Sequence, residues 1–223
     1  MIVHANGIDI FYKKCGEGKP FLIIHGNGES LSTYEELATA LSMEYEVFTL
    51  DSRCHGKSTR TKTISYQDMT SDIAAFITEL GLEKPILLGA SDGGITGLML
   101  AIQYPDVLSA LIACGANTNP SQLKKWVLTL IKLSYFFTRD PKIKMMLDEP
   151  DIRGADLAKI VIPTLILSGS RDIIAESVTN DIAKAIPGSE VKILKRETHE
   201  SYLKNHNKIM NEINPWIKKK LLQ

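Results

Sequence analysis

The chain has 223 residues, and its 26 Lys and Arg balance 26 Asp and Glu, so the formal net charge is zero. This length suits one domain with a substantial core, and a hydrophobic content of 44% is typical of globular proteins. The balanced charge removes the electrostatic basis for general binding to nucleic acids or anionic membranes, so we expect neither partner.

Three cysteines, Cys15, Cys54 and Cys114, form an odd and widely spaced set without a C-x-x-C pair. This spacing is typical neither of a disulfide framework nor of a thiolate metal site, and we expect no metal and no organic cofactor. The N-terminal residues lack a basic segment followed by an apolar core, and no stretch approaches the roughly 18 apolar residues that span a bilayer. We therefore expect a cytoplasmic protein.

The first elements in chain order are predicted to be a hairpin and a buried strand. Residues 2–5 and 8–14 flank Asn6-Gly7, which favours a type I′ turn. Residues 21–24 form a short apolar run of the kind that is buried on both faces of a sheet. We expect a helix after this strand, because Ser32-x-x-Glu35 has the form of a capping box.

From residue 45 onward, strand and helix patterns alternate. The helix after the strand at 45–50 has apolar residues at Ile73, Phe76, Ile77 and Leu80, and Gly81 ends it. Such alternation predicts a mostly parallel sheet with helices on both faces. The further predicted strands lie at 86–88, 107–113, 163–167 and 191–194, and the helices at 95–103, around 178–186 and from 202 onward.

One segment interrupts this alternation, since no strand pattern occurs between residues 116 and 150. An amphipathic stretch occupies it, with two open interpretations. It is one more helix pair that packs on the core, or it is a small helical lid at about 117–150, in which Trp126 and Phe136 contact the substrate. The two are compatible, because a lid must pack on something. We predict that residues 1–223 form a single domain with this lid.

The stretch Gly89-Ala90-Ser91-Asp92-Gly93 has the form G-x-S-x-G, between a predicted strand and a predicted helix. A sharp strand-to-helix turn forces its central residue into a strained backbone conformation, and glycines on both sides let the two elements approach. The turn would present the Ser91 hydroxyl at a helix N-terminus, where partial positive charge favours a developing oxyanion. The motif therefore predicts a nucleophilic serine.

Over essentially its whole length the chain resembles the α/β-hydrolases. Besides residues 89–93, the resemblance rests on His25-Gly26-Asn27-Gly28, on the D-x-R-C-H-G-K-S stretch at 51–58, on residues 162–172 and on Thr198-His199-Glu200. It implies a mostly parallel eight-stranded sheet with an antiparallel N-terminal hairpin, helices on both faces and a short helical lid. Cys54 departs from the family pattern, which usually has glycine at this position.

A serine hydroxyl needs a base, and five histidines compete for this role. His199 lies in the loop after the last predicted strand, in the family's chain order of serine, acid and histidine, so we predict that it is the base. The other four lie in the first hairpin, in two glycine-rich loops and in the C-terminal helix: His4, His25, His55 and His206.

Asp172, at the end of the strand before His199, is the predicted orienting acid. The alternative for Asp172 is a helix N-cap before residues 173–175. Some family members carry the acid one strand earlier, but Asn117 and Asn119 occupy that position here. The resemblance further implies an oxyanion hole made of the backbone N–H groups of Asn27 and Asp92.

Asp92 leaves two interpretations open. The residues around it are similar to the biphenyl hydrolase-like branch, which implies esters of α-amino acids, whose ammonium group would pair with this carboxylate. The alternative is that Asp92 only opens a helix, where a negative charge contributes roughly 0.3–1 kcal/mol.

We therefore expect a serine hydrolase that acts on small to medium carboxylic esters through an acyl-enzyme, as a monomer or homodimer. A carbon–carbon bond hydrolase and a cofactor-free perhydrolase use the same triad and stay open as alternatives. A non-catalytic homologue that binds a small molecule is the third, although a receptor has no chemical need for all three residues.

Overall fold

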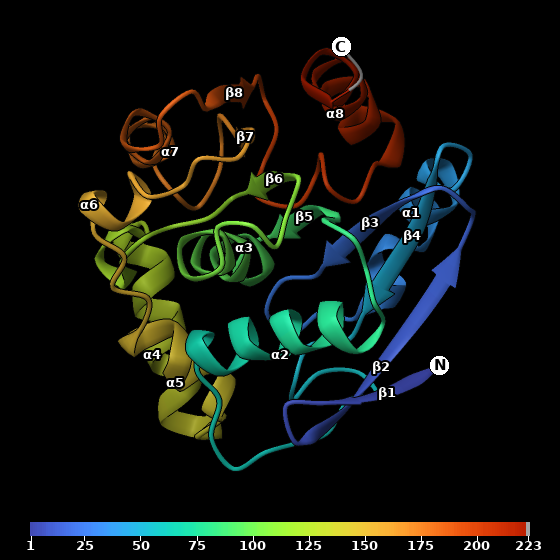
Figure 1. The fold of residues 1–223 in the computed structure, drawn as a ribbon. Coiled ribbons are helices and arrows are strands. Elements are labelled where there is room, and N and C mark those ends of the chain that lie inside the picture. Colours follow the sequence, from blue (N-terminus) through green and yellow to red (C-terminus); the bar gives the residue numbers. More distant parts are fainter. Residues whose placement is uncertain (222–223) are drawn as a thin grey trace.

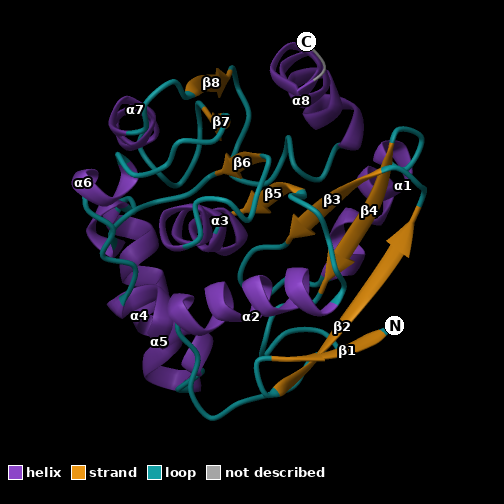
Figure 2. Cartoon of the chain, in the orientation of Figure 1, coloured by secondary structure: helices purple, strands orange, loops and turns teal. Residues whose placement is uncertain are grey.

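The computed structural model describes residues 1–221, which fold around one eight-stranded sheet in the order β1-β2-β4-β3-β5-β6-β7-β8 (Figures 1 and 2). The first hairpin is antiparallel and pairs antiparallel with β4, and the other strands run parallel. The predicted α/β-hydrolase fold is thereby confirmed. The strands are β1 Ile2–Ala5, β2 Ile8–Cys15, β3 Lys19–Ile24, β4 Tyr45–Leu50, β5 Ile86–Ala90, β6 Ala110–Cys114, β7 Thr164–Gly169 and β8 Glu190–Leu194.

Helices cover both faces of the sheet, with α1 and α8 on one side and α2, α3 and α7 on the other (Figure 1). The α-helices are α1 Glu35–Leu41, α2 Tyr66–Glu79, α3 Asp92–Gln103, α4 Lys125–Thr138, α5 Pro141–Asp148, α6 Gly154–Leu157, α7 Glu176–Ala185 and α8 His206–Leu221, and two 3₁₀ turns lie at Leu31–Tyr34 and Pro120–Gln122. Within residues 1–221 no helix combines the length and the apolar content that crossing a bilayer requires.

Strand β3 shows why the central strands are apolar throughout. Phe21 and Ile23 belong to the core under α1 and α8, whereas Leu22 and Ile24 belong to the core under α2 and α3. All four side chains are at most 1% exposed. Because successive side chains of a strand point to opposite faces, a strand covered on both sides has no polar face.

Two local predictions are corrected by the structure. Ser32 lies inside a 3₁₀ turn and its hydroxyl contacts Ser30, so no capping box forms, and α1 begins at Glu35. The strand predicted at 107–113 begins only at Ala110, because its neighbour β5 begins at Ile86, the partner of Ala110 in the sheet.

The segment between β6 and β7 contains α4 and α5, which pack against each other at the edge of the molecule (Figure 1). Several contacts attach this segment to the body of the protein. Leu123 forms an isolated antiparallel bridge with Ile174, and the N–H of Lys124 donates to the carbonyl of Ile173 at 3.0 Å. Within α4 Val127 is buried, and within α5 Met145 is buried.

Candidate active site

The turn from β5 into α3 holds Ser91 at a φ of 51°, in the left-handed region that residues with a side chain rarely adopt. A Cβ atom at Gly89 would lie 2.2 Å from the carbonyl oxygen of Gly93, and one at Gly93 would lie 2.3 Å from that of Ile24. Both positions therefore require glycine. These close approaches hold the strained serine in place.

His199 links the predicted nucleophile to the predicted acid. Its Nδ1 lies 2.7 Å from Oδ1 of Asp172, and its Nε2 lies 3.0 Å from Oγ of Ser91. Because a carboxylate can only accept, Nδ1 carries the proton and Nε2 is free to accept from the hydroxyl. The structure thus brings together three residues that lie up to 108 positions apart in the chain.

Asp172 is 1% exposed, and backbone N–H groups hold its carboxylate. Oδ1 accepts from Ile174 at 3.1 Å and Oδ2 accepts from Gly169 at 3.4 Å. Gly115 lies against the histidine ring: a Cβ atom there would stand 2.7 Å from Cε1 of His199. Gly115, for which the sequence indicated no role at the histidine, is thus required to make room for the ring.

The pKa of His199 reflects two opposing effects. Burial of the ring lowers it, while the hydrogen bond and the charge of Asp172 raise it, and the net result is a pKa above the usual value for histidine. A raised pKa means that the ring of His199 takes up a proton readily, which is the property of a general base.

His25 and His55 brace the loops behind the nucleophile. Nε2 of His25 accepts from the N–H of Ser52 at 3.0 Å, and Nε2 of His55 accepts from the N–H of Gly28 at 3.2 Å. Burial lowers the pKa of His25 below its usual value and that of His55 to about 4. Both rings are therefore neutral at pH 7 and able to accept these hydrogen bonds.

Asp92 is buried, and its carboxylate is shared between two partners. Oδ1 accepts from the hydroxyl of Tyr66 at 2.7 Å, and Oδ2 accepts from Nδ2 of Asn27 at 3.0 Å. Burial raises the pKa of Asp92 above its usual value, against the opposing effect of these two hydrogen bonds. The hydrogen bond between Asn27 and the Asp92 side chain thus joins the two residues whose backbone N–H groups are the predicted oxyanion hole.

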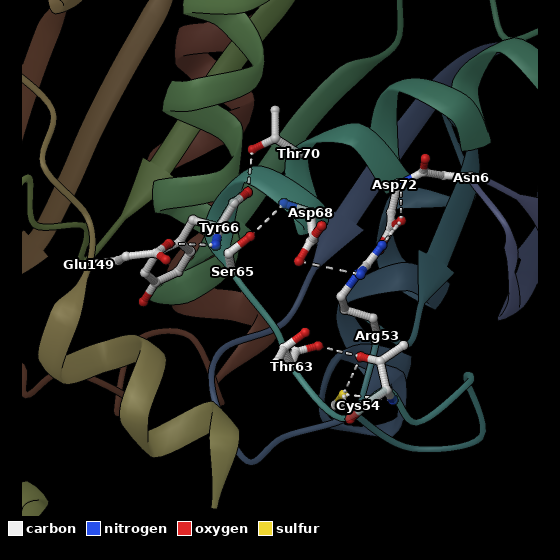
Figure 3. A network of polar contacts seen from close by, with 11 residues as sticks. Asn6, Arg53, Cys54, Thr63, Ser65, Tyr66, Asp68, Thr70, Asp72 and Glu149 are labelled. Carbon is white, nitrogen blue, oxygen red and sulfur yellow. Dashed lines mark hydrogen bonds and ion pairs between the residues drawn. The ribbon is translucent and has the colours of Figure 1, made fainter.

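Tyr66, which no local motif indicated, lies at the start of α2 in the polar network of Figure 3. Its N–H donates to Oε2 of Glu149, just after α5, at 2.9 Å. Further along the helix, Asp72 receives two hydrogen bonds of 2.5 Å from Arg53. These contacts tie the first turns of α2 to the loop after β4 and to the end of α5, so Tyr66 is held where it meets Asp92.

A cavity of about 170 Å³ opens beside the serine. Glu29 lies in its wall, and Oε2 of Glu29 accepts from the N–H of Gly26 at 2.9 Å and from the hydroxyl of Tyr34 at 3.1 Å. The lining combines two residues of the predicted triad, Ser91 and His199, with apolar, polar and acidic residues: Gly26, Asn27, Glu29, Tyr34, Ala90, Ser91, Met146, Ile173, His199, Glu200 and Leu203. Its size suits small substrates.

The predicted substrate contacts of Trp126 and Phe136 are corrected. Both side chains lie on the outer side of α4, 61% and 63% exposed, and neither lines the cavity. The residue of this segment that does so is Met146 in α5. Helical periodicity predicts that α4 is amphipathic, but it does not say which face meets the site.

The remaining histidines lie on the surface, where His4 contacts Asp9 and His206 contacts Glu36. Among residues 1–221 no group of three His, Cys, Asp or Glu side chains has the arrangement of a metal site.

The comparisons with known proteins agree with this geometry. The model of the alpha/beta hydrolase fold family matches residues 19–144. The sn-1-specific diacylglycerol lipase ABHD11 of Danio rerio is 32% identical over 115 residues, which cover 51% of this chain and 35% of the lipase. The 2-hydroxy-6-oxo-6-(2'-aminophenyl)hexa-2,4-dienoic acid hydrolase of Metapseudomonas resinovorans is 26% identical over 149 residues, 65% of this chain and 51% of that enzyme.

The chain therefore spans about a third to a half of the length of these curated relatives. Among solved structures, the enol-lactonase of Burkholderia xenovorans LB400 superimposes with a TM-score of 0.82 at 18% identity, covering 98% of this chain and 100% of that one. At this level of identity the likeness concerns the fold alone.

Proposed function

Because the chain belongs to the α/β-hydrolase fold family, we propose that it is a serine-dependent hydrolase of small to medium carboxylic esters that works through an acyl-enzyme intermediate. The observation that carries the proposal is the hydrogen-bonded series Ser91–His199–Asp172, with separations of 3.0 Å and 2.7 Å, of which Ser91 and His199 lie in the wall of a cavity. A hydroxyl, an imidazole and a carboxylate in this order turn a weak nucleophile into a strong one.

In the first step, Nε2 of His199 accepts the hydroxyl proton while Oγ of Ser91 attacks the carbonyl carbon of the ester. Asp172 holds the ring in the required tautomer and stabilises the imidazolium that forms. The carbonyl oxygen becomes an oxyanion near the N–H groups of Asn27 and Asp92. Because Asp92 is the first residue of α3, its N–H has no acceptor within the helix. Each such donor is worth about 2.7–4 kcal/mol to the transition state.

The intermediate then collapses as the imidazolium of His199 donates its proton to the leaving alcohol, which leaves the acyl group on Ser91. Water enters, gives a proton to Nε2 of His199 and attacks the acyl carbon. The second tetrahedral intermediate breaks to release the carboxylic acid and restores the hydroxyl of Ser91.

In this proposal Asp92 positions the oxyanion hole, because it is 2% exposed, holds Tyr66 and Asn27 through its carboxylate, and does not line the cavity of about 170 Å³. A preference for α-amino acid esters is then supported by a different acid, Glu29. A Cβ atom built on Gly26 would lie 3.2 Å from Oε2 of Glu29 and 3.1 Å from Cβ of Ser91, so this carboxylate lies close to the nucleophile. The hydrogen-bond partners of Glu29 are uncharged donors, which leave its negative charge available to a substrate ammonium.

A fluorophosphonate probe tests the main proposal. We expect it to label the folded wild-type protein at Ser91 and to leave Ser91→Ala unlabelled, and we expect the wild type alone to hydrolyse p-nitrophenyl acetate and butyrate. A folded wild-type protein without label or turnover would contradict the proposal and would favour a homologue that only binds a small molecule.

The amino acid preference is tested with matched esters that do or do not carry an α-amino group. Glu29→Gln keeps an oxygen that can accept from Gly26 and Tyr34 but removes the charge. We expect kcat/KM to fall about tenfold for the amino ester only, which corresponds to roughly 1.4 kcal/mol. Glu200→Gln is the control, because Lys204 already pairs with that carboxylate. An equal loss for both esters would assign Glu29 a purely structural role.

Carbon–carbon bond cleavage is the second candidate, since the Metapseudomonas resinovorans relative is named as the hydrolase of a dienoic acid. The cavity lining argues for the ester reading, because it contains two acidic side chains, Glu29 and Glu200, and neither Lys nor Arg. An acidic substrate would meet repulsion there. If the protein turned over a 2-hydroxy-6-oxo-dienoate faster than any ester, carbon–carbon bond cleavage would replace ester hydrolysis as the favoured function.

A further inference from the structure

Helix α4 exposes an apolar stripe to solvent. Its residues Trp126, Leu130, Leu133 and Phe137 are spaced by four, three and four positions, so they share one face of the helix. They are 61%, 56%, 52% and 74% exposed. Phe136 lies next to them, 63% exposed. A contiguous apolar surface of this kind marks a contact site, because isolated exposed side chains are common but a continuous row of large ones is not.

A row of positive charges accompanies the stripe. Lys125 and Lys132 are seven residues apart and lie on one side of α4, Arg139 follows directly after the end of the helix, and all three are exposed. Within residues 1–221 no ion pair involves any of the three. Residues 123–139 contain no Asp or Glu. The zero net charge of the chain therefore conceals a local positive field at this helix.

We propose that α4 binds the surface of an anionic lipid bilayer, lying in the interface with its apolar stripe toward the acyl chains and its cations at the head groups. A helix with Trp, Phe and Leu on one face and Lys and Arg beside them has the composition of an interfacial amphipathic helix. Trp126 and the two phenylalanines are large enough to enter the boundary between head groups and acyl chains.

A second copy of this chain is a less suitable occupant of the same surface. Two α4 helices packed stripe to stripe would leave the cations of both copies without a partner at this contact, because α4 has no acidic side chain to pair with them. Anionic head groups supply the missing negative charge, and each Lys or Arg near such a surface contributes about 1 kcal/mol.

The position of α4 gives this contact a consequence for the cavity. The amino group of Lys124, next to α4, donates to the backbone carbonyl of Asp172, and Met146 of the adjoining α5 lines the cavity. Docking of α4 would therefore hold the cavity close to the lipid surface, from which apolar esters partition. This consequence rests on the proposed function, whereas the lipid binding itself does not.

Vesicle binding of the full chain tests the proposal, with Trp126 as the reporter. The other tryptophan, Trp216, is 2% exposed and keeps its environment. We expect Trp126 emission to shift to shorter wavelength with vesicles of equal parts phosphatidylcholine and phosphatidylglycerol, and co-sedimentation with them. Vesicles of phosphatidylcholine alone should bind far more weakly. Ser91→Ala should bind like the wild type, which separates this test from that of the hydrolase activity.

Variants of exposed side chains assign the binding to α4. Leu133→Ser should weaken vesicle binding about tenfold, and Lys132→Gln about fivefold. Lys195→Gln, an exposed lysine outside α4, should leave it unchanged. Circular dichroism confirms that each variant is folded. Absence of vesicle binding, or equal effects of Lys132→Gln and Lys195→Gln, would overturn the proposal. A dimer that Leu133→Ser dissociates, without vesicle binding, would overturn it in favour of self-association.

Discussion

In α3 nine of the twelve residues are buried, whereas α4, with 14 residues, buries Val127. Both helices are rich in apolar residues. Helix α3 packs against the sheet and against α2, and its glycines let the backbone approach neighbouring strands closely enough to hold Ser91 in place. Helix α4 contacts mainly α5 and leaves its largest side chains in solvent. The comparison separates two uses of an apolar helix: one builds a rigid site, and the other offers a surface.

The largest effect is expected where the rigid site performs the chemistry. Asp172→Asn should lower kcat by about 10⁴-fold, because the ring of His199 loses the partner that sets its tautomer. Catalysis requires neutral His199, so activity falls as the pH drops through its pKa. Asp172 raises this pKa, and the acidic limb of the remaining activity should therefore move to lower pH in the variant.

A pH–rate profile of kcat/KM measures both effects. Asp106→Asn is the control, since its side chain is 96% exposed and far from any catalytic contact that we describe. An unshifted acidic limb in Asp172→Asn would show that another group orients His199.

The next effect concerns the close approach of α3 to the sheet. Gly93→Ala would place Cβ 2.3 Å from the carbonyl oxygen of Ile24, so the backbones must separate, and we expect a loss of about 3 kcal/mol in the free energy of unfolding. Gly154→Ala at the start of α6 is the matched control, since nothing lies within 4 Å of its new Cβ. Urea unfolding measures both, and similar stabilities of the two variants would contradict the comparison.

A smaller effect is expected at the polar network that supports the site. Tyr66→Phe leaves Oδ1 of buried Asp92 without its donor, which should cost about 1–3 kcal/mol of stability. Since Asp92 also holds Asn27, the variant should lose activity as well. Tyr104→Phe, at a 39% exposed position, is the control for removal of a hydroxyl. If both variants unfold at the same urea concentration, the hydroxyl of Tyr66 contributes nothing to stability.

The smallest effect on stability is expected in α4. Leu133→Ala should change the free energy of unfolding by less than about 0.5 kcal/mol, because the side chain is already 52% exposed. Leu98→Ala in α3, at 0% exposure, should cost about 2–5 kcal/mol. Thermal unfolding compares the two. A large loss in Leu133→Ala would mean that the apolar face of α4 is covered in the folded protein.

Much of the fold and of the candidate site could be predicted from the sequence, because the signals are local. The Asn6-Gly7 turn, the apolar run of β3 and the glycines around Ser91 each depend on neighbours within a few residues. Asp172 and His199 could be chosen by chain order, since parallel strands end at one edge of the sheet and bring their following loops together.

Other features depended on contacts between segments far apart in the chain. The sequence predicted that α4 is amphipathic but placed Trp126 and Phe136 in the pocket, because periodicity defines two faces and does not say what covers either. Tyr66 meets Asp92 across 26 residues, and Gly115 makes room for a ring 84 positions later. The local sequence sets the propensities for helix, strand and turn. Which side chains are buried, and which distant residues they contact, depends on packing and is decided only by the tertiary structure.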